Sequence, residues 1–124
     1  MKNARTWFLL VALLIPSARG AGDLTVAVTV SVPDGGWRVS IREVYRVKNE
    51  LWAVSRLSRE AGMAIQVISK VSDSVSVSSG PLPVKHFLLG KTWKWKNSEP
   101  YEFPPDRKTL DAKLKGAKLL FKKK

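Results

Sequence analysis

The chain has 124 residues, of which 22 are Lys or Arg, 10 are Asp or Glu, one is His and none is Cys. This length predicts a single domain, and a hydrophobic fraction of 44% is enough for that domain to bury a core. The absence of cysteine excludes a disulfide framework, a thiol nucleophile and a cysteine-ligated metal site. One histidine leaves little capacity for acid–base or metal chemistry, so we expect no cofactor and no metal.

The first twenty residues have the layout of a cleaved secretory signal peptide. Lys2 and Arg5 precede an apolar run at residues 7–15, and small residues follow up to Gly20. Nine apolar residues span only about 14 Å as a helix, well short of a hydrocarbon core of about 30 Å. We therefore predict cleavage after Gly20 and export of the mature protein to the periplasm or the medium.

The positive charge is unevenly distributed along the predicted mature chain, residues 21–124. Residues 21–84 contain seven Lys or Arg against six Asp or Glu, whereas residues 85–124 contain twelve against four. The C-terminal third is therefore the strongly basic part of an otherwise nearly neutral domain. Such a concentration of charge favours contact with anionic partners.

Two segments of alternating hydrophobicity predict a pair of strands. Residues 24–32 and 37–47 alternate apolar with small, polar or basic side chains, and a Pro-Asp-Gly-Gly turn separates them. Pairing the segments as a hairpin, with Val32 opposite Trp37, puts both apolar sets on the same face of one sheet. We therefore predict this hairpin, in which Glu43 is the one side chain that does not fit the register.

A helix is the alternative for residues 40–61. Ser40 and Glu43 have the spacing of a capping box, and the apolar side chains recur every three or four residues up to Gly62. The hairpin is favoured, because the Val, Tyr and Trp of this stretch are typical strand residues.

Further strands follow about every ten residues, which is typical of a sandwich or barrel. Turn sequences separate the strands expected at residues 51–58, 63–71 and 84–89, and the first of these is apolar on both faces, as in a central strand. These patterns predict an all-β fold. We expect a small antiparallel β-sandwich of immunoglobulin-like size in residues 21–124, preceded by the signal peptide at 1–20.

The C-terminal segment fits either a strand or a short helix. Apolar residues from Leu110 to Phe121 stand at helical spacing, whereas those from Leu110 to Leu114 also alternate with charged residues. Gly116 disfavours one long helix, so we expect a closing strand at about 116–121.

No group of residues has the composition of a catalytic site. His86 is the only imidazole and lies in the predicted strand at 84–89, where we expect it to be structural. The serines lack the Gly-x-Ser-x-Gly turn of a nucleophile, and the acids are scattered, with Glu43 and Glu50 a weak pair at best. We therefore predict that the protein is not an enzyme and has no catalytic or metal-binding residues.

Residues 91–97, Lys-Thr-Trp-Lys-Trp-Lys-Asn, are the first candidate binding site. Interleaved basic and aromatic residues are typical of surfaces that stack rings and hold anionic groups. In a regular strand, however, the two tryptophans would face the core and the lysines the solvent. In an exposed loop the rings would instead form an anchor for a protein partner. The candidate residues are Lys91, Trp93, Lys94, Trp95 and Lys96.

A row of arginines and a basic tail are the second candidate. Arg38, Arg42 and Arg46 share one face of the predicted strand at 37–47, about 13 Å apart, and either follow an anionic polymer or are simply solvated. The tail at 113–124 either binds anionic surfaces through counterion release or keeps the protein soluble. The tail ends with Lys122, Lys123 and Lys124.

The sequence favours an exported, non-catalytic β-sandwich that binds another protein through the loops near residues 91–97. The alternative is a binder of an anionic polysaccharide, or of an envelope or membrane surface, that uses the arginine row and the terminal lysines. Binding of a specific nucleic acid is not expected. A peptidase inhibitor and an enzyme are the least favoured classes.

Overall fold

The computed structural model describes residues 23–62 and 65–123, which form two β-sheets and one helix. The elements are β1 (Leu24–Val32), β2 (Trp37–Val47), β3 (Glu50–Arg59), β4 (Ser69–Val77), β5 (Val84–Leu89), α3 (Arg107–Lys113) and β6 (Lys118–Lys122). This architecture confirms the predicted all-β class. The predicted signal peptide and its cleavage site lie outside the described residues.

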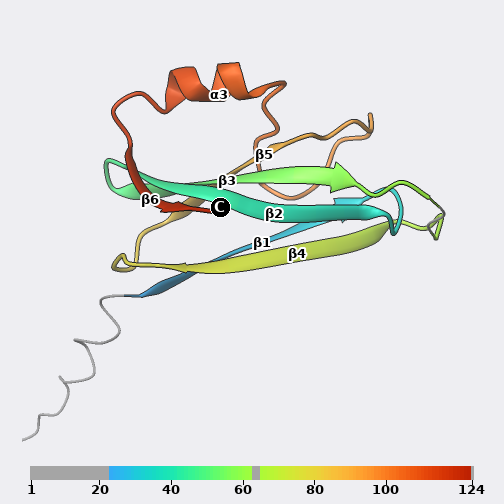
Figure 1. The fold of residues 1–124 in the computed structure, drawn as a ribbon, viewed down its shortest axis with the longest axis horizontal. Helices are drawn as coiled ribbons and strands as arrows, with labels where there is room; N and C mark the ends of the chain where they lie inside the picture. Colours follow the sequence, from blue (N-terminus) through green and yellow to red (C-terminus); the bar gives the residue numbers. More distant parts are fainter. Residues whose placement is uncertain (1–22, 63–64, 124) are drawn as a thin grey trace, which may run out of the picture.

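The two sheets pack face to face as a β-sandwich (Figure 1). β1 and β4 form a two-stranded antiparallel sheet, and the larger sheet has the strand order β5-β3-β2-β6. In the larger sheet β2 pairs antiparallel with β3 and β6, while β3 and β5 run parallel. The helix α3 covers the side of the larger sheet that faces away from β1 and β4, which we call the outer face (Figure 1).

The predicted hairpin between residues 24–32 and 37–47 is wrong, although both segments are strands. β1 pairs with β4 in the smaller sheet, and β2 pairs with β3 in the larger one. The turn at 33–36 therefore carries the chain from one sheet to the other, and the two apolar faces meet across the sandwich. An alternating pattern is compatible with both arrangements, because it specifies the buried face and not the partner strand.

Asp34 fixes the geometry of this crossing. Its buried carboxylate accepts hydrogen bonds from the Gly36 amide at 2.8 Å and from Arg59 Nε at 3.1 Å. The Gly36 amide and the adjacent guanidinium hold the pKa of Asp34 below its ordinary value. The Glu60 amide donates in turn to the Gly36 carbonyl oxygen, so the crossing is tied to the end of β3.

β2 and β3 form a hairpin at the centre of the larger sheet, with its turn at Lys48 and Asn49. Lys48 has a φ of 56°, in the left-handed region that such tight turns require. The helix considered for residues 40–61 is therefore not formed. β3 lies between β2 and β5 and confirms the predicted central strand.

A β-bulge interrupts the regular alternation of β2. The register against β3 shifts between Ile41 and Glu43, so that Arg42 is an extra residue on β2. Beyond the bulge the buried residue is Val44, which explains why Glu43 does not fit the simple pattern. The Ile41 amide donates to Asp73 Oδ2 of β4 at 2.8 Å, and this bond links the two sheets.

β4 begins later than the strand predicted at 63–71. Its first residue is Ser69, and residues 65–68 are exposed and outside any strand, while Met63 lies outside the described residues. Within β4, Val71, Val75 and Val77 pack against the core. The predicted strand therefore overlaps β4 only at residues 69–71, and both its start and its end differ from those of β4.

Apolar cores lie on both sides of the larger sheet. The inner core, between the sheets, includes Val26, Val28, Val30 and Val32 of β1, each at most 1% exposed. The outer core lies under α3 and consists of Val54, Phe87, Leu89, Leu110 and Leu114, with Tyr45, Trp52 and Ala117 packed against it. β3 contributes to both cores, as expected for a strand that is apolar on both faces.

The C-terminal segment contains both of the elements that the sequence left open. Asp106 is the N-cap of α3, and its carboxylate accepts a hydrogen bond from the Thr109 amide at 2.8 Å. Gly116, with a φ of 82°, then turns the chain into β6. The closing strand expected at about 116–121 is therefore confirmed with a small shift, and it pairs with β2.

Candidate functional site

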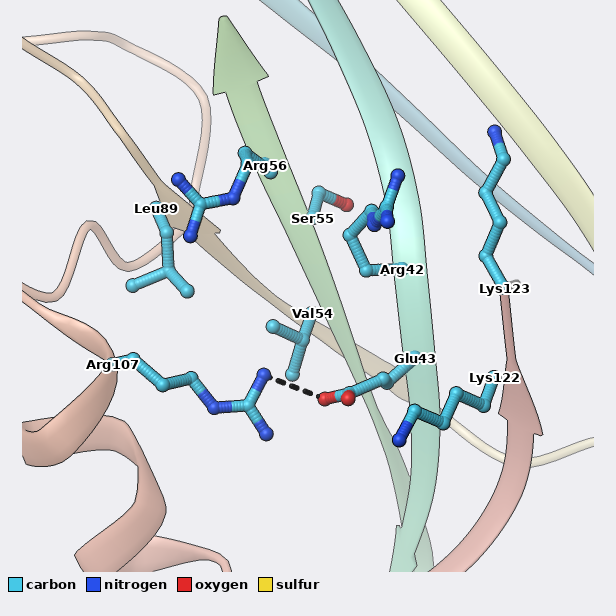
Figure 2. A pocket seen from close by; sticks show the side chains of 9 residues that line it. All are labelled: Arg42, Glu43, Val54, Ser55, Arg56, Leu89, Arg107, Lys122 and Lys123. Carbon is cyan, nitrogen blue, oxygen red and sulfur yellow. Dashed lines mark ion pairs between the residues drawn. The ribbon is translucent and has the colours of Figure 1, made fainter.

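A pocket of about 220 Å³ opens on the outer face beside α3 (Figure 2). Residues of β2, β3, β5 and β6 and the first residue of α3 surround it. We call it the outer-face pocket; its lining residues are Arg42, Glu43, Val54, Ser55, Arg56, Leu89, Arg107, Lys122 and Lys123. Five of these nine side chains are cationic and one is acidic.

The strand geometry explains how the basic side chains come together. The bulge lets the neighbouring residues Arg42 and Glu43 both line the pocket, where a regular strand would send them to opposite faces. Arg56 follows Val54 by two residues on β3 and so shares its outer face. The pairing of Glu43 with Lys122 brings the end of β6 to the same place.

Glu43 and Arg107 form the ion pair drawn in Figure 2. Arg107 Nη1 lies 2.7 Å from Glu43 Oε1, and the Tyr45 hydroxyl donates to the same oxygen at 2.9 Å. Burial raises the pKa of Tyr45, and its hydrogen bond to the Glu43 carboxylate raises it further. Burial alone would lower the pKa of Arg107, but hydrogen bonds to Asp111, Glu43 and Tyr45 outweigh burial and raise it. The one acid of the pocket is therefore held by Arg107.

The remaining positive charge of the pocket is not neutralised. Among the residues that the structure describes, no side-chain hydrogen bond or ion pair engages Arg42, Arg56 or Lys122. Lys123 Nζ donates to the Ser40 hydroxyl at 2.9 Å, which leaves its charge uncompensated. Like charges repel at close range, so this arrangement favours an anion between them.

The arginine row predicted from the sequence is interrupted. Arg38 lies before the bulge and Arg42 lies at it. Arg46 follows the buried Val44 by two residues, so it belongs to the side of β2 that faces the inner core. Arg38 is also engaged, since its Nη1 donates to the Trp37 carbonyl oxygen at 2.8 Å. Of the three arginines, only Arg42 lines the outer-face pocket.

The lysine tail is in large part a paired strand. Lys122 belongs to β6, and the Lys123 amide donates to the Arg42 carbonyl oxygen at 2.8 Å. Both lysines line the pocket, while Lys124 lies outside the described residues. The structure thus joins members of the two basic groups, the row and the tail, at one site.

Residues 91–97 are a loop, as one of the two interpretations required. The Trp93 ring packs edge-on against Trp37 with centroids 5.0 Å apart, and Trp95 lies against Trp93 at 5.5 Å. Trp93 is half-buried, whereas Trp95 is 38% exposed. The basic members divide in the same way: Lys91 Nζ lies 4.7 Å from the centre of the Phe103 ring, while Lys94 and Lys96 are exposed.

A buried polar network holds this loop against the edge of β1. Asn97, which is 7% exposed, accepts from Trp93 Nε1 at 2.9 Å and donates to the Ser31 carbonyl oxygen at 2.8 Å. Glu99 accepts from the Ser31 amide and hydroxyl at 2.9 and 2.8 Å. Burial would raise the pKa of Glu99, but hydrogen bonds from Asn97 and Ser31 outweigh it and lower that pKa. The indole N–H of Trp93 is therefore used inside the fold.

His86 is buried in β5, 8% exposed, with its ring 4.9 Å from that of Tyr101. Burial lowers its pKa, although a hydrogen bond to the Ala27 backbone acts in the opposite direction. Across residues 23–62 and 65–123, no three His, Cys, Asp or Glu side chains are grouped to hold a metal ion. In the same part of the chain, no helix has the length and apolar character needed to cross a bilayer.

Arg56 and Arg107 line the pocket but are not among the site residues predicted from the sequence. Arg56 could have been found, because strict alternation from Val54 in the predicted strand places it on the same face. Arg107 could not, because its position depends on α3, which the sequence left ambiguous.

Comparison with models of known protein families, with curated proteins and with solved structures finds no significant match.

Proposed function

We propose that this protein is a non-catalytic binding module that holds polyanions on the outer face of its larger sheet. The observation that carries the proposal is the outer-face pocket, which five cationic residues line and where the one acid, Glu43, is already paired. The surrounding surface adds to the positive charge, since residues 85–124 contain twelve Lys or Arg against four acids.

Electrostatic attraction is the mechanism of this binding. A polyanion releases condensed counterions when Lys and Arg side chains neutralise its charges, so its affinity falls steeply with salt. Arginine is well suited to the contact, because its planar fork donates two parallel hydrogen bonds to one anionic group. We expect the exported protein to meet such groups on polysaccharides or envelope surfaces.

Retention on immobilised heparin tests the proposal. Replacing Arg42 and Arg56 by Gln should lower the salt concentration at which the protein elutes, because two unpaired cations of the pocket are lost. A matched variant, Arg46→Gln with Lys70→Gln, removes the same net charge from β2 beyond the bulge and from β4. Equal elution of the two double variants would show that only net charge matters and would refute a localised site.

A protein partner is the second candidate, and the exposed Trp95 is the observation that favours it. Trp95 stacks on Trp93, which packs against Trp37, while the Gly35 amide donates to the Ile65 carbonyl oxygen, so residues 91–97 and 65–68 both lie near the crossing at 33–37. Ile65, Val67 and Ile68 are exposed apolar side chains in the second of these segments. A pull-down with the wild type at low and high salt tests this role, since an apolar anchor keeps its partner at high salt. Loss of that partner in a folded Trp95→Ala variant would support the anchor, and retention would exclude it.

A further inference from the structure

The outer-face pocket has the size of a site for one small chemical group. Its volume of about 220 Å³ is below the ~300–1,000 Å³ of typical small-molecule sites. Its lining includes Val54 and Leu89, which are 1% and 5% exposed. Apolar neighbours exclude water from part of the pocket and strengthen the field of the charges around it.

The charge of the pocket requires a ligand with more than one negative charge. Arg107 is balanced by Glu43, and Arg42, Arg56, Lys122 and Lys123 remain. A carboxylate or a phosphodiester would bring a single negative charge. A phosphate monoester or inorganic phosphate carries about −1.5 to −2 at neutral pH and has three or more acceptor oxygens.

The types of donor in the pocket also suit a phosphate group. Two arginines, from β2 and β3, and a lysine from β6 line the pocket, each from a different strand (Figure 2). Forked guanidinium donors pair with two phosphate oxygens each, while a lysine supplies a compact point charge. Two guanidinium groups and one ammonium group together offer more donors than the two oxygens of a carboxylate can accept.

We infer that the outer-face pocket binds one terminal phosphate group, held by Arg42, Arg56 and Lys122. The inference rests on the proposed function, because it names the anionic group that the same face recognises. The phosphate is either free or the end of a larger molecule, such as a phosphomonoester or a lipid headgroup with a terminal phosphate.

Calorimetric titration of the purified protein with sodium phosphate at low ionic strength tests the inference. We expect saturable binding of one phosphate per protein, and a loss of affinity of at least about tenfold in Arg42→Gln/Arg56→Gln. Lys122→Gln should weaken binding in the same direction. The matched variant Arg46→Gln/Lys70→Gln should change the affinity by less than about twofold, because these charges lie outside the pocket. Unchanged thermal unfolding of each variant serves as the folding control.

The protonation of phosphate gives a second test. Lowering the pH from about 7 to about 5 removes most of the dianion, so phosphate should bind about tenfold more weakly. Sulfate stays dianionic over this range and should not show that loss. Glycerol 3-phosphate and vesicles of phosphatidylcholine with and without phosphatidic acid then distinguish a soluble ester from a lipid headgroup as the source.

The outcomes separate this inference from the proposed function. Phosphate that fails to saturate, or that binds the Arg42→Gln/Arg56→Gln variant as tightly as the wild type, overturns the inference. If heparin retention still depends on Arg42 and Arg56 in that case, the proposed function stands. Saturable phosphate binding without heparin retention would instead refute polyanion binding and leave the phosphate pocket in place.

Discussion

Ser55 is a polar side chain in an apolar setting. It is fully buried, and within the described part of the chain its hydroxyl oxygen has no hydrogen-bond partner. Its cross-strand neighbour is Ile41, a member of the inner core, so the Ser55 side chain belongs to the inner side of β3. Ser55 is also among the residues that line the outer-face pocket.

The Ser55→Ala variant should be more stable than the wild type. A buried hydroxyl without a partner costs its desolvation free energy, so its removal should raise the free energy of unfolding by about 1 kcal/mol. Urea denaturation measures the change. A decrease of similar size would mean that the Ser55 hydroxyl does have a partner. Ser72→Ala is the contrasting variant, because it removes a hydroxyl that is hydrogen-bonded to Thr29 at 2.9 Å.

At the scale of elements, Gly90 shows how closely β5 approaches the end of β3. A Cβ at this position would lie 2.3 Å from the Leu57 carbonyl oxygen, and Gly90 has a φ of 98°. Any other residue would therefore meet both a backbone clash and an unfavourable conformation. The sequence predicts a strand at 84–89 but could not show this approach, because Leu57 is 33 residues away in the chain.

Gly90→Ala should lower the free energy of unfolding by at least about 2 kcal/mol, because the clash adds to the left-handed penalty. Gly116 is the matched control, since it has a φ of 82° and nothing within 4 Å of an added Cβ. Gly116→Ala should cost only about 1–2 kcal/mol, the conformational penalty alone. Equal losses in the two variants, measured by chemical denaturation, would contradict the close approach to Leu57.

The strands themselves could be predicted from the sequence, but their partners could not. Alternation in residues 24–32 and 37–47 identified both buried faces, because side chains of a strand point to opposite sides in turn. Whether two such faces lie side by side or opposite each other depends on contacts distant in sequence, such as that of Leu24 with Val77. The same limit applies to the site, whose Arg42 is positioned by a bulge that no local pattern reveals.

At the scale of the whole molecule, the stability of the fold depends on pH through His86. Its pKa is lowered by burial from the ordinary 6.5, so the folded state favours the neutral imidazole. The unfolded chain takes up the proton first as the pH falls. The contribution of His86 to the free energy of unfolding is therefore complete above pH 6.5, the pKa of the unfolded chain. It is lost as the pH falls from 6.5 to the lower pKa of the folded state.

Urea midpoints measured across this range should show the loss. One group of this kind gives a slope of up to about 1.4 kcal/mol per pH unit. A His86→Gln variant lacks the titrating ring, so its stability should be flat over the same interval even if it is lower overall. A parallel decline in wild type and variant would assign the pH dependence to other groups.

The fold also changes how the positive charge of the chain is distributed in space. The sequence placed it in a tail, whereas the structure brings part of that tail back onto the sheet as β6, next to arginines from β2 and β3. A composition that suggested diffuse attraction therefore produces a localised cluster. The pairing of Lys122 with Glu43 brings the basic tail next to the arginines of the pocket, and so makes the charge local.

The covered edge of β1 has a consequence for self-association. Sheets with open edges recruit strands from other molecules and grow into aggregates, because their ladder amides are free to pair. On β1, the Ser31 amide is bound by Glu99 and the Thr29 amide donates to the Tyr101 hydroxyl at 3.3 Å. An approaching strand finds these positions occupied, so the segment at 97–101 blocks the addition of a strand at the β1 edge of the sheet.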